Sequence, residues 1–107
     1  MTETSEEDRK LVTLARGAMA RAGAGHGAAV RDLDGRTYAG APVALASLAL
    51  TGLQVAVATA LSSGAEGFEA AVLVGGAGVE DAGVAALHEV SPTAPVLLFD
   101  ARGEALT

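Results

Sequence analysis

One stretch decides the fold, residues 70–100, which reads AAVLVGGAGVEDAGVAALHEVSPTAPVLLFD. Its first five residues are an unbroken apolar run closed by two glycines, which is typical of a strand covered on both faces. Residues 79–90 then repeat apolar side chains at helical spacing, and residues 95–100 begin with a second apolar run. A strand, a helix and a strand in this order predict parallel strands joined by a right-handed crossover.

The chain before this stretch predicts one helix and one hairpin. Residues 5–22 carry apolar side chains at helical spacing after Ser5, a residue type favoured at helix N-caps. An Asp-Gly pair at residues 34–35 then separates two short extended runs, residues 28–31 and 36–39. Such a pair between two extended runs is a strong signal for an antiparallel hairpin.

Residues 44–63, ALASLALTGLQVAVATALSS, are apolar on every side, so we expect a central helix that is buried all round. The element order becomes α-β-β-α-β-α-β. This order predicts an α/β fold, a three-layer α-β-α sandwich with a mixed sheet of about four strands. We expect one domain over residues 1–107, since the length fits a single modest core.

Composition excludes several classes of function. Seven basic and thirteen acidic residues give a net charge of −6, which argues against a nucleic-acid surface. With no cysteine, the chain has no disulfide and no thiolate metal ligand. The uncharged run 37–65 is long enough to span a bilayer, but alanines and polar residues dilute it and no aromatic belt brackets it. The first twelve residues lack the pattern of a secretion signal. We expect a cytoplasmic protein without cofactor.

Several collinear segments resemble the cytidine deaminase family. The segments are Gly27-Ala28-Ala29, Asp34-Gly35-Arg36-Thr37-Tyr38-Ala39-Gly40, Pro42-Val43-Ala44-Leu45-Ala46-Ser47, Ala60-Leu61-Ser62-Ser63-Gly64, and Pro95-Val96-Leu97-Leu98 with Asp100-Ala101-Arg102-Gly103-Glu104. Each match is a scaffold match, and together they cover nearly the whole chain. The resemblance implies the deaminase fold.

The same resemblance implies where a catalytic site would lie. Active members hold a water-activating zinc with a Cys/His-Ala-Glu triplet and a Pro-Cys-x-x-Cys motif. The triplet falls on Thr51-Gly52-Leu53, and the two later cysteines fall near Val79 and Ala82. The residues that read base and ribose fall on Pro42 and Ala44. None of these side chains binds zinc or moves a proton, so we expect no metal and no catalytic residue, only a remnant site filled by apolar groups.

Other polar groups leave alternatives open. Gln54 lines a remnant pocket or caps a neighbouring backbone group at a subunit contact, while Ser47 and Thr51 are expected to bond carbonyls one helical turn earlier. Gly75, Gly76 and Gly78 form a possible phosphate loop, for which turn glycines are the simpler explanation. His26 and His88 are expected in surface or capping roles, since no partner stands at metal-ligand spacing.

Three functions follow from this interpretation. The first is a non-catalytic deaminase homologue that self-associates as a dimer or tetramer or binds a protein partner, with a regulatory or scaffolding role. The second is a binding module that keeps a nucleoside-sized cleft. The third is a deaminase, converting cytidine to uridine, or another hydrolase. We favour the first, with neither a nucleic acid nor a membrane as partner.

Overall fold

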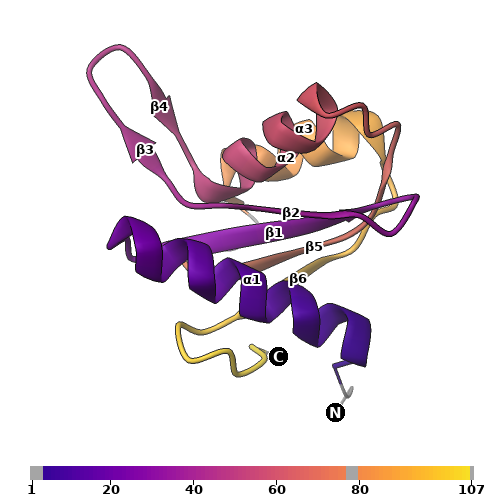
Figure 1. Cartoon of the computed structure of the whole chain (residues 1–107), viewed down its shortest axis with the longest axis horizontal. Coiled ribbons are helices and arrows are strands. Elements are labelled where there is room, and N and C mark those ends of the chain that lie inside the picture. Colours follow the sequence, from indigo (N-terminus) through magenta and orange to yellow (C-terminus); the bar gives the residue numbers. More distant parts are fainter. Residues whose placement is uncertain (1–3, 77–79, 107) are drawn as a thin grey trace.

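The computed structural model describes residues 4–76 and 80–106. In chain order its elements are α1 (Glu6–Ala22), β1 (His26–Asp32), β2 (Thr37–Gly40), β3 (Val43–Ala44), β4 (Ala49–Leu50), α2 (Gly52–Ser62), β5 (Phe68–Gly75), α3 (Ala82–Val90) and β6 (Val96–Phe99). Figure 1 shows three layers, with α1 on one face of the sheet and α2 and α3 on the other. The predicted α-β-α sandwich is confirmed.

The main sheet has four strands in the order β2-β1-β5-β6. β1 runs antiparallel to β2 and to β5, whereas β5 and β6 are parallel and are linked through α3. The sheet is therefore mixed, as the sequence predicts. Because β1 lies between β2 and β5, the connection through α2 passes across β1 and places this helix over the middle of the sheet.

Alternate residues of the central strands pack into two separate hydrophobic cores, one on each face of the sheet. On the α2 and α3 face, Ala28 and Val30 of β1 and Leu73 of β5 pack with Leu53 and Leu87. On the α1 face, the intervening strand residues, including Ala29, Val72 and Val74, pack with Leu11, Val12, Ala15 and Phe99. A strand covered on both faces must be apolar at every position, which explains the unbroken run of β5.

The first helix begins and ends where the sequence predicts. The Ser5 hydroxyl oxygen accepts a hydrogen bond from the Asp8 backbone N–H at 3.1 Å, which caps the first turn. Gly23 follows the last turn in the left-handed conformation (φ 62°), and its N–H is bonded to carbonyls of that turn. The predicted range 5–22 is confirmed.

The predicted hairpin is also present, and its turn is organised by one buried carboxylate, Asp32. Its Oδ1 accepts hydrogen bonds from the Asp34 and Arg36 backbone N–H groups at 2.9 Å each, and the Tyr38 hydroxyl donates to Oδ2 at 3.0 Å. Burial alone raises the pKa of this carboxyl, but these three hydrogen bonds outweigh burial, so the pKa lies below its ordinary value. Gly35 supplies the positive φ of 84° that the turn requires.

The expected helix over residues 44–63 is wrong over residues 44–51. Helix α2 begins at Gly52, and residues 43–50 form the small β3–β4 hairpin instead. The reason lies in Thr51, whose extended backbone (φ −78°, ψ 164°) and capping box with Gln54 fix the helix start there. The helix is also not buried all round, because Leu61 is 41% exposed.

The last helix is three residues shorter at its start than the predicted range 79–90. It begins at Ala82 after Asp81, whose carboxylate accepts from the Gly83 backbone N–H at 2.7 Å as an N-cap. Val79 lies outside the described residues. Among the helices in the described ranges, none is long and apolar enough to cross a membrane.

Candidate functional site

The N-termini of α2 and α3 meet at a group of polar side chains that we call the helix-start cluster: His26, Thr51, Gln54 and Asp81. Its central contact joins the two helices, since the Thr51 hydroxyl donates to Asp81 Oδ1 at 2.6 Å. The same carboxylate oxygen accepts from the Gly83 N–H, and Asp81 is only 7% exposed. One carboxylate therefore caps α3 and holds the cap residue of α2.

Thr51 and Gln54 form a complete capping box. The Gln54 N–H donates to the Thr51 hydroxyl oxygen at 3.1 Å, and the Thr51 N–H donates to Gln54 Oε1 at 2.9 Å. Of the two alternatives for Gln54, the structure shows backbone capping, within the chain itself. Thr51 makes no bond to a carbonyl one turn earlier, because residues 43–50 are not helical. Ser47 is exposed in the turn between β3 and β4.

His26 reaches the cluster from the first position of β1. Its Nε2 lies 3.2 Å from the backbone nitrogen of Gly52, the first residue of α2, and accepts that N–H. His88 lies elsewhere, with Nε2 at 2.9 Å from the carbonyl of Ala94, and joins α3 to the segment before β6. Both histidines act on the backbone.

The two helices and the sheet approach very closely around the cluster. A Cβ added at Gly83 would lie 2.6 Å from Leu53 Cβ and 2.7 Å from the Gln54 nitrogen. A Cβ added at Gly52 would lie 2.9 Å from the Gly40 carbonyl oxygen. Real Cβ atoms do not come closer than about 3 Å to such neighbours, so these contacts require glycine. Little space is left between α2, α3 and β2.

The structure brings together only some of the residues assigned to the remnant site. Thr51, Leu53 and Gln54 lie in the first turn of α2, and Ala82 is exposed at the start of α3. Pro42 is half-buried between β2 and β3, directly after the first hairpin. Ala44 lies apart, exposed on β3, and Val79 is outside the described residues.

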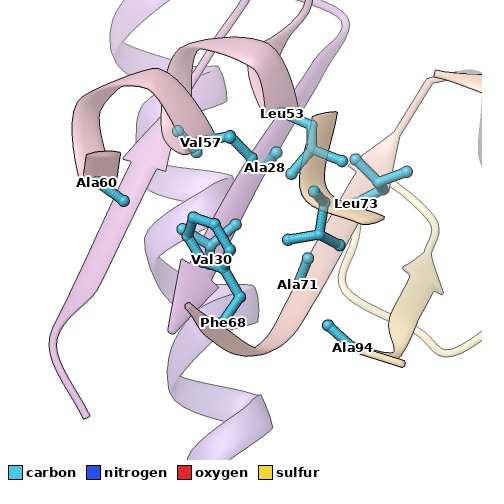
Figure 2. Close-up of a cluster of buried hydrophobic side chains, with 11 residues drawn as sticks. Ala28, Val30, Leu53, Val57, Ala60, Phe68, Ala71, Leu73 and Ala94 are labelled. Carbon is cyan, nitrogen blue, oxygen red and sulfur yellow. The ribbon is translucent and has the colours of Figure 1, made fainter. Parts of the chain in front are cut away.

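Leu53 occupies the position that the family resemblance gives to the proton-carrying glutamate. It is fully buried (0% exposed) in the core between α2, α3 and the sheet. Figure 2 shows Leu53 among the side chains of this core, with Val57 and Ala60 of the same helix and Leu73 of β5. A carboxylate at this depth would need a partner that these neighbours do not provide.

The donor groups present do not fit a zinc ion. Zinc in proteins is held by thiolates, imidazoles and carboxylates, usually four in a tetrahedron. At the helix starts the described residues offer one imidazole, a carboxylate and a hydroxyl, and His26 Nε2 and Asp81 Oδ1 are already hydrogen-bonded within the cluster. Within residues 4–76 and 80–106, no three histidine or acidic side chains are grouped so that they could hold a metal ion.

The glycine loop after β5 borders the cluster on the β1 side. Gly75 and Gly76 have φ of 66° and 80°, and a Cβ at Gly76 would lie 2.7 Å from the Cβ of His26. Backbone conformation and close approach therefore account for both glycines. Gly78 is outside the described residues, so a ligand-binding role for this loop stays a prediction.

Sequence reasoning missed two members of the cluster, His26 and Asp81. Local signals existed for the helix starts: Thr51-Gly52-Leu53-Gln54 is a capping-box pattern, and Asp81 followed by alanine and glycine suits an N-cap. His26 carries no such signal, because its partner lies 26 positions further along the chain. Only the pairing of β1 with β5 and the crossover of α2 bring it there.

This combination of a mixed four-stranded sheet, a helix on one face and two converging helix starts on the other defines a class of fold. The family model described as "Cytidine deaminase-like" matches residues 4–103. The chain belongs to the cytidine deaminase-like family. A search of the curated proteins found no match.

Three solved structures agree with this assignment. A cytidine deaminase from Burkholderia pseudomallei superimposes with a TM-score of 0.77 at 23% identity, covering 96% of this chain and 91% of that one. Cytidine deaminase from Mycobacterium leprae gives 0.70 at 20% identity, covering 94% and 92%. A mutant cytidine deaminase from Mycobacterium tuberculosis gives 0.67 at 23% identity, covering 90% and 85%. At these identities the likeness shows the fold alone.

Proposed function

We propose that this chain is a non-catalytic member of the cytidine deaminase-like family that acts through protein contact, first of all with copies of itself. The observation that carries the proposal is the 2.6 Å hydrogen bond from the Thr51 hydroxyl to Asp81. It joins the two helix starts at the place where the family resemblance puts the metal. A hydroxyl and a carboxylate bonded to each other, with Leu53 beside them, support a closed structural contact in place of a reaction centre.

A nucleoside-binding role has less support. Such a site needs polar groups that converge on a ligand. The Thr51 hydroxyl and Gln54 Oε1 are each committed to hydrogen bonds that cap α2. The glycines at positions 40, 52 and 83 bring the surrounding backbone into direct contact. Protein contact also fits the leucines that are exposed within the uncharged residues 37–65.

The experiment that tests the absence of catalysis measures metal and turnover together. The full chain is produced in zinc-supplemented medium, its zinc content is measured by mass spectrometry, and conversion of cytidine to uridine is followed. A zinc-dependent cytidine deaminase prepared in parallel serves as the positive control. We expect zinc far below one ion per chain and no turnover above buffer. One zinc per chain with turnover would overturn the proposal.

A further inference from the structure

Strand β2 is one of the two edges of the main sheet, because the strand order is β2-β1-β5-β6. At the opposite edge the chain covers itself: Ala105 forms a bridge with Phe99, and the Leu106 N–H donates to the Leu98 carbonyl at 2.9 Å. Figure 1 shows β2 between α1 and α2, which cover the two faces of this strand. Its outer edge has no such cover among the described residues.

The ladder between β1 and β2 determines which main-chain groups of β2 face outward. The Asp32 N–H donates to the Arg36 carbonyl at 2.8 Å, and bonded pairs alternate with non-bonded pairs along an antiparallel ladder. Thr37 and Ala39 are therefore at non-bonded positions, and their N–H and C=O groups point away from β1. Within residues 4–76 and 80–106, no main-chain group bonds to them. An open edge of this kind is a template for another extended chain.

A groove borders this edge on the α1 face of the sheet. Lys10, Thr13 and Leu14 of α1 and Thr37 of β2 line it, and its volume is about 360 Å³. Ala39 packs on the same face, against the core beneath α1. Because side chains alternate along a strand, a residue opposite Thr37 on an added strand would point its side chain into the groove. An apolar side chain there would cover Leu14, which is 39% exposed.

The open edge defines the chemistry of what binds. Unpaired N–H and C=O groups need a partner with main-chain donors and acceptors of its own, which an acyl chain lacks. A nucleic acid is repelled by the net charge of −6. A second copy could offer its own β2, but two antiparallel β2 strands related by a twofold axis would bring only threonine and alanine to the groove. These side chains are too small to fill it.

The rim of the groove adds a charge preference. The Lys10 ammonium is 64% exposed, and its printed partner is Glu7 at 3.3 Å, one turn away on the same helix. Such an exposed pair contributes little stability, so an acidic residue of a partner can replace Glu7 at small cost. The groove therefore favours an apolar residue with an acidic residue two positions away, on the same face of the added strand.

We propose that the β2 edge binds an extended segment of another protein, which joins the sheet as a fifth strand and places an apolar side chain in the groove opposite Thr37. Main-chain hydrogen bonds supply the affinity of such strand addition, and side-chain pockets supply the selectivity. The inference goes beyond the proposed self-association, because it names a different partner and does not require an oligomer. Strand β2 has four residues, so the contact is short and the binding weak and reversible.

The test uses capped hexapeptides as probes, acetyl-Glu-Thr-X-Thr-Val-Thr-amide, in which X is alanine, valine, leucine or phenylalanine. Binding to the full chain is measured by NMR titration. We expect a dissociation constant below about 1 mM for the leucine probe. The alanine probe should bind about tenfold more weakly, since it buries fewer methylene groups in the groove. Absence of binding by all four probes at millimolar concentration would overturn the proposal.

Matched substitutions locate the contact. Thr37→Pro removes an N–H that faces outward and keeps the ladder with β1, whereas Thr37→Val keeps that N–H. Leu14→Glu puts a charge in the groove, and Leu61→Glu puts the same charge on α2 at a matched exposure of 41%. We expect Thr37→Pro and Leu14→Glu to weaken the leucine probe about tenfold or more, and the two controls to bind it as the wild type does.

Circular dichroism shows whether each variant is folded. Wild-type affinity in folded Thr37→Pro and Leu14→Glu would place the probe elsewhere and contradict the proposal, as would equal losses in their controls.

Amide hydrogen exchange gives a measurement that needs no substitution. In the free chain we expect the outward N–H groups of Thr37 and Ala39 to exchange fast, and the Tyr38 N–H, which faces β1, to exchange slowly. A leucine probe at ten times its dissociation constant should slow Thr37 and Ala39 about tenfold. Exchange that stays unchanged at both positions while the probe binds would contradict strand addition at this edge.

The outcomes separate this inference from the proposed function. Sedimentation velocity without probe reports self-association, and the probe titration reports the edge. A chain that dimerises but binds no probe refutes the inference and leaves the proposed function standing, whereas a monomer that binds the probe supports the inference and refutes self-association. If the Thr37 and Ala39 amides become protected as the protein concentration rises without probe, a second copy occupies the edge and the inference is wrong.

Discussion

At the scale of single residues, two buried carboxylates have different tasks. Asp32 and Asp81 are 1% and 7% exposed and are the buried charged residues in the described part of the chain. Asp32 accepts three hydrogen bonds inside one turn, whereas Asp81 joins two elements that are 30 positions apart. A buried carboxylate stabilises a fold only when it is hydrogen-bonded, and both meet this condition.

The pKa of Asp32 predicts how stability depends on pH. Its pKa is lowered below the ordinary value of 3.8, so the ionised group stabilises the fold above that pH, and this contribution is lost as the pH falls through the lowered pKa. We expect Asp32→Asn to lower the urea midpoint at pH 7, because the uncharged amide accepts these bonds less strongly. The difference from wild type should shrink as the pH falls toward 3.

The matched control is Asp34→Asn in the same turn. The Asp34 side chain is 75% exposed and pairs with Arg36 at 3.8 Å. The substitution therefore removes one negative charge, as Asp32→Asn does, but disturbs no buried hydrogen-bond network. Its midpoint should follow that of the wild type at each pH. Equal losses in the two variants would show that Asp32 acts only through net charge.

At the scale of elements, the start of α2 depends on Thr51. Thr51→Val keeps the shape of the side chain but removes the acceptor for the Gln54 N–H and the donor to Asp81. We expect a loss of about 1–2 kcal/mol in the free energy of unfolding, as for other lost N-caps. Urea unfolding followed by circular dichroism measures it.

Thr59→Val on the same helix is the control. The Thr59 hydroxyl donates to the Val55 carbonyl at 2.7 Å on the exposed side, so its loss should change stability by no more than about 0.5 kcal/mol. Thr51→Ser, which keeps the hydroxyl, should stay close to wild type. Comparable losses in Thr51→Val and Thr59→Val would contradict the capping role.

Most elements were predictable from sequence because their signals are local. Ser5 and Gly23 mark both ends of α1, and the Asp-Gly pair marks the first hairpin. The β3–β4 hairpin was not predictable from periodicity, since an alanine- and leucine-rich run suits a helix equally well. The capping box at Thr51 decides between a helix and a hairpin for residues 43–50, because it makes α2 start only after them.

The candidate site was predictable only in part, for a physical reason. The family resemblance places Thr51 and Leu53 at the site because they belong to one continuous segment. His26 precedes that segment in the sequence and Asp81 follows it. Only long-range contacts in the folded chain bring the two residues to the site. Because the chain has no cysteine, no residue type in the sequence pointed to His26 and Asp81 as members of the site.

At the scale of the whole molecule, the net charge opposes the proposed self-association. Each copy carries −6, so two copies that associate must overcome the repulsion between their negative charges. Salt screens this repulsion, since the Debye length falls from about 10 Å at 0.1 M to about 3 Å at 1 M. We expect the dimer to become tighter as sodium chloride rises, measured by sedimentation velocity at fixed protein concentration.

The direction of the salt effect distinguishes the kinds of contact. An interface held by ion pairs weakens with salt, so weakening would contradict an uncharged contact.

The contact between Gly40 and Gly52 limits which side chains the start of α2 can accept. The family resemblance aligns Gly52 with the alanine of the Cys/His-Ala-Glu triplet, and a methyl group here would lie 2.9 Å from the Gly40 carbonyl oxygen. Placing that triplet on residues 51–53 would therefore force β2 and α2 apart. A redesign of this segment has to move the main chain as well as exchange the side chains.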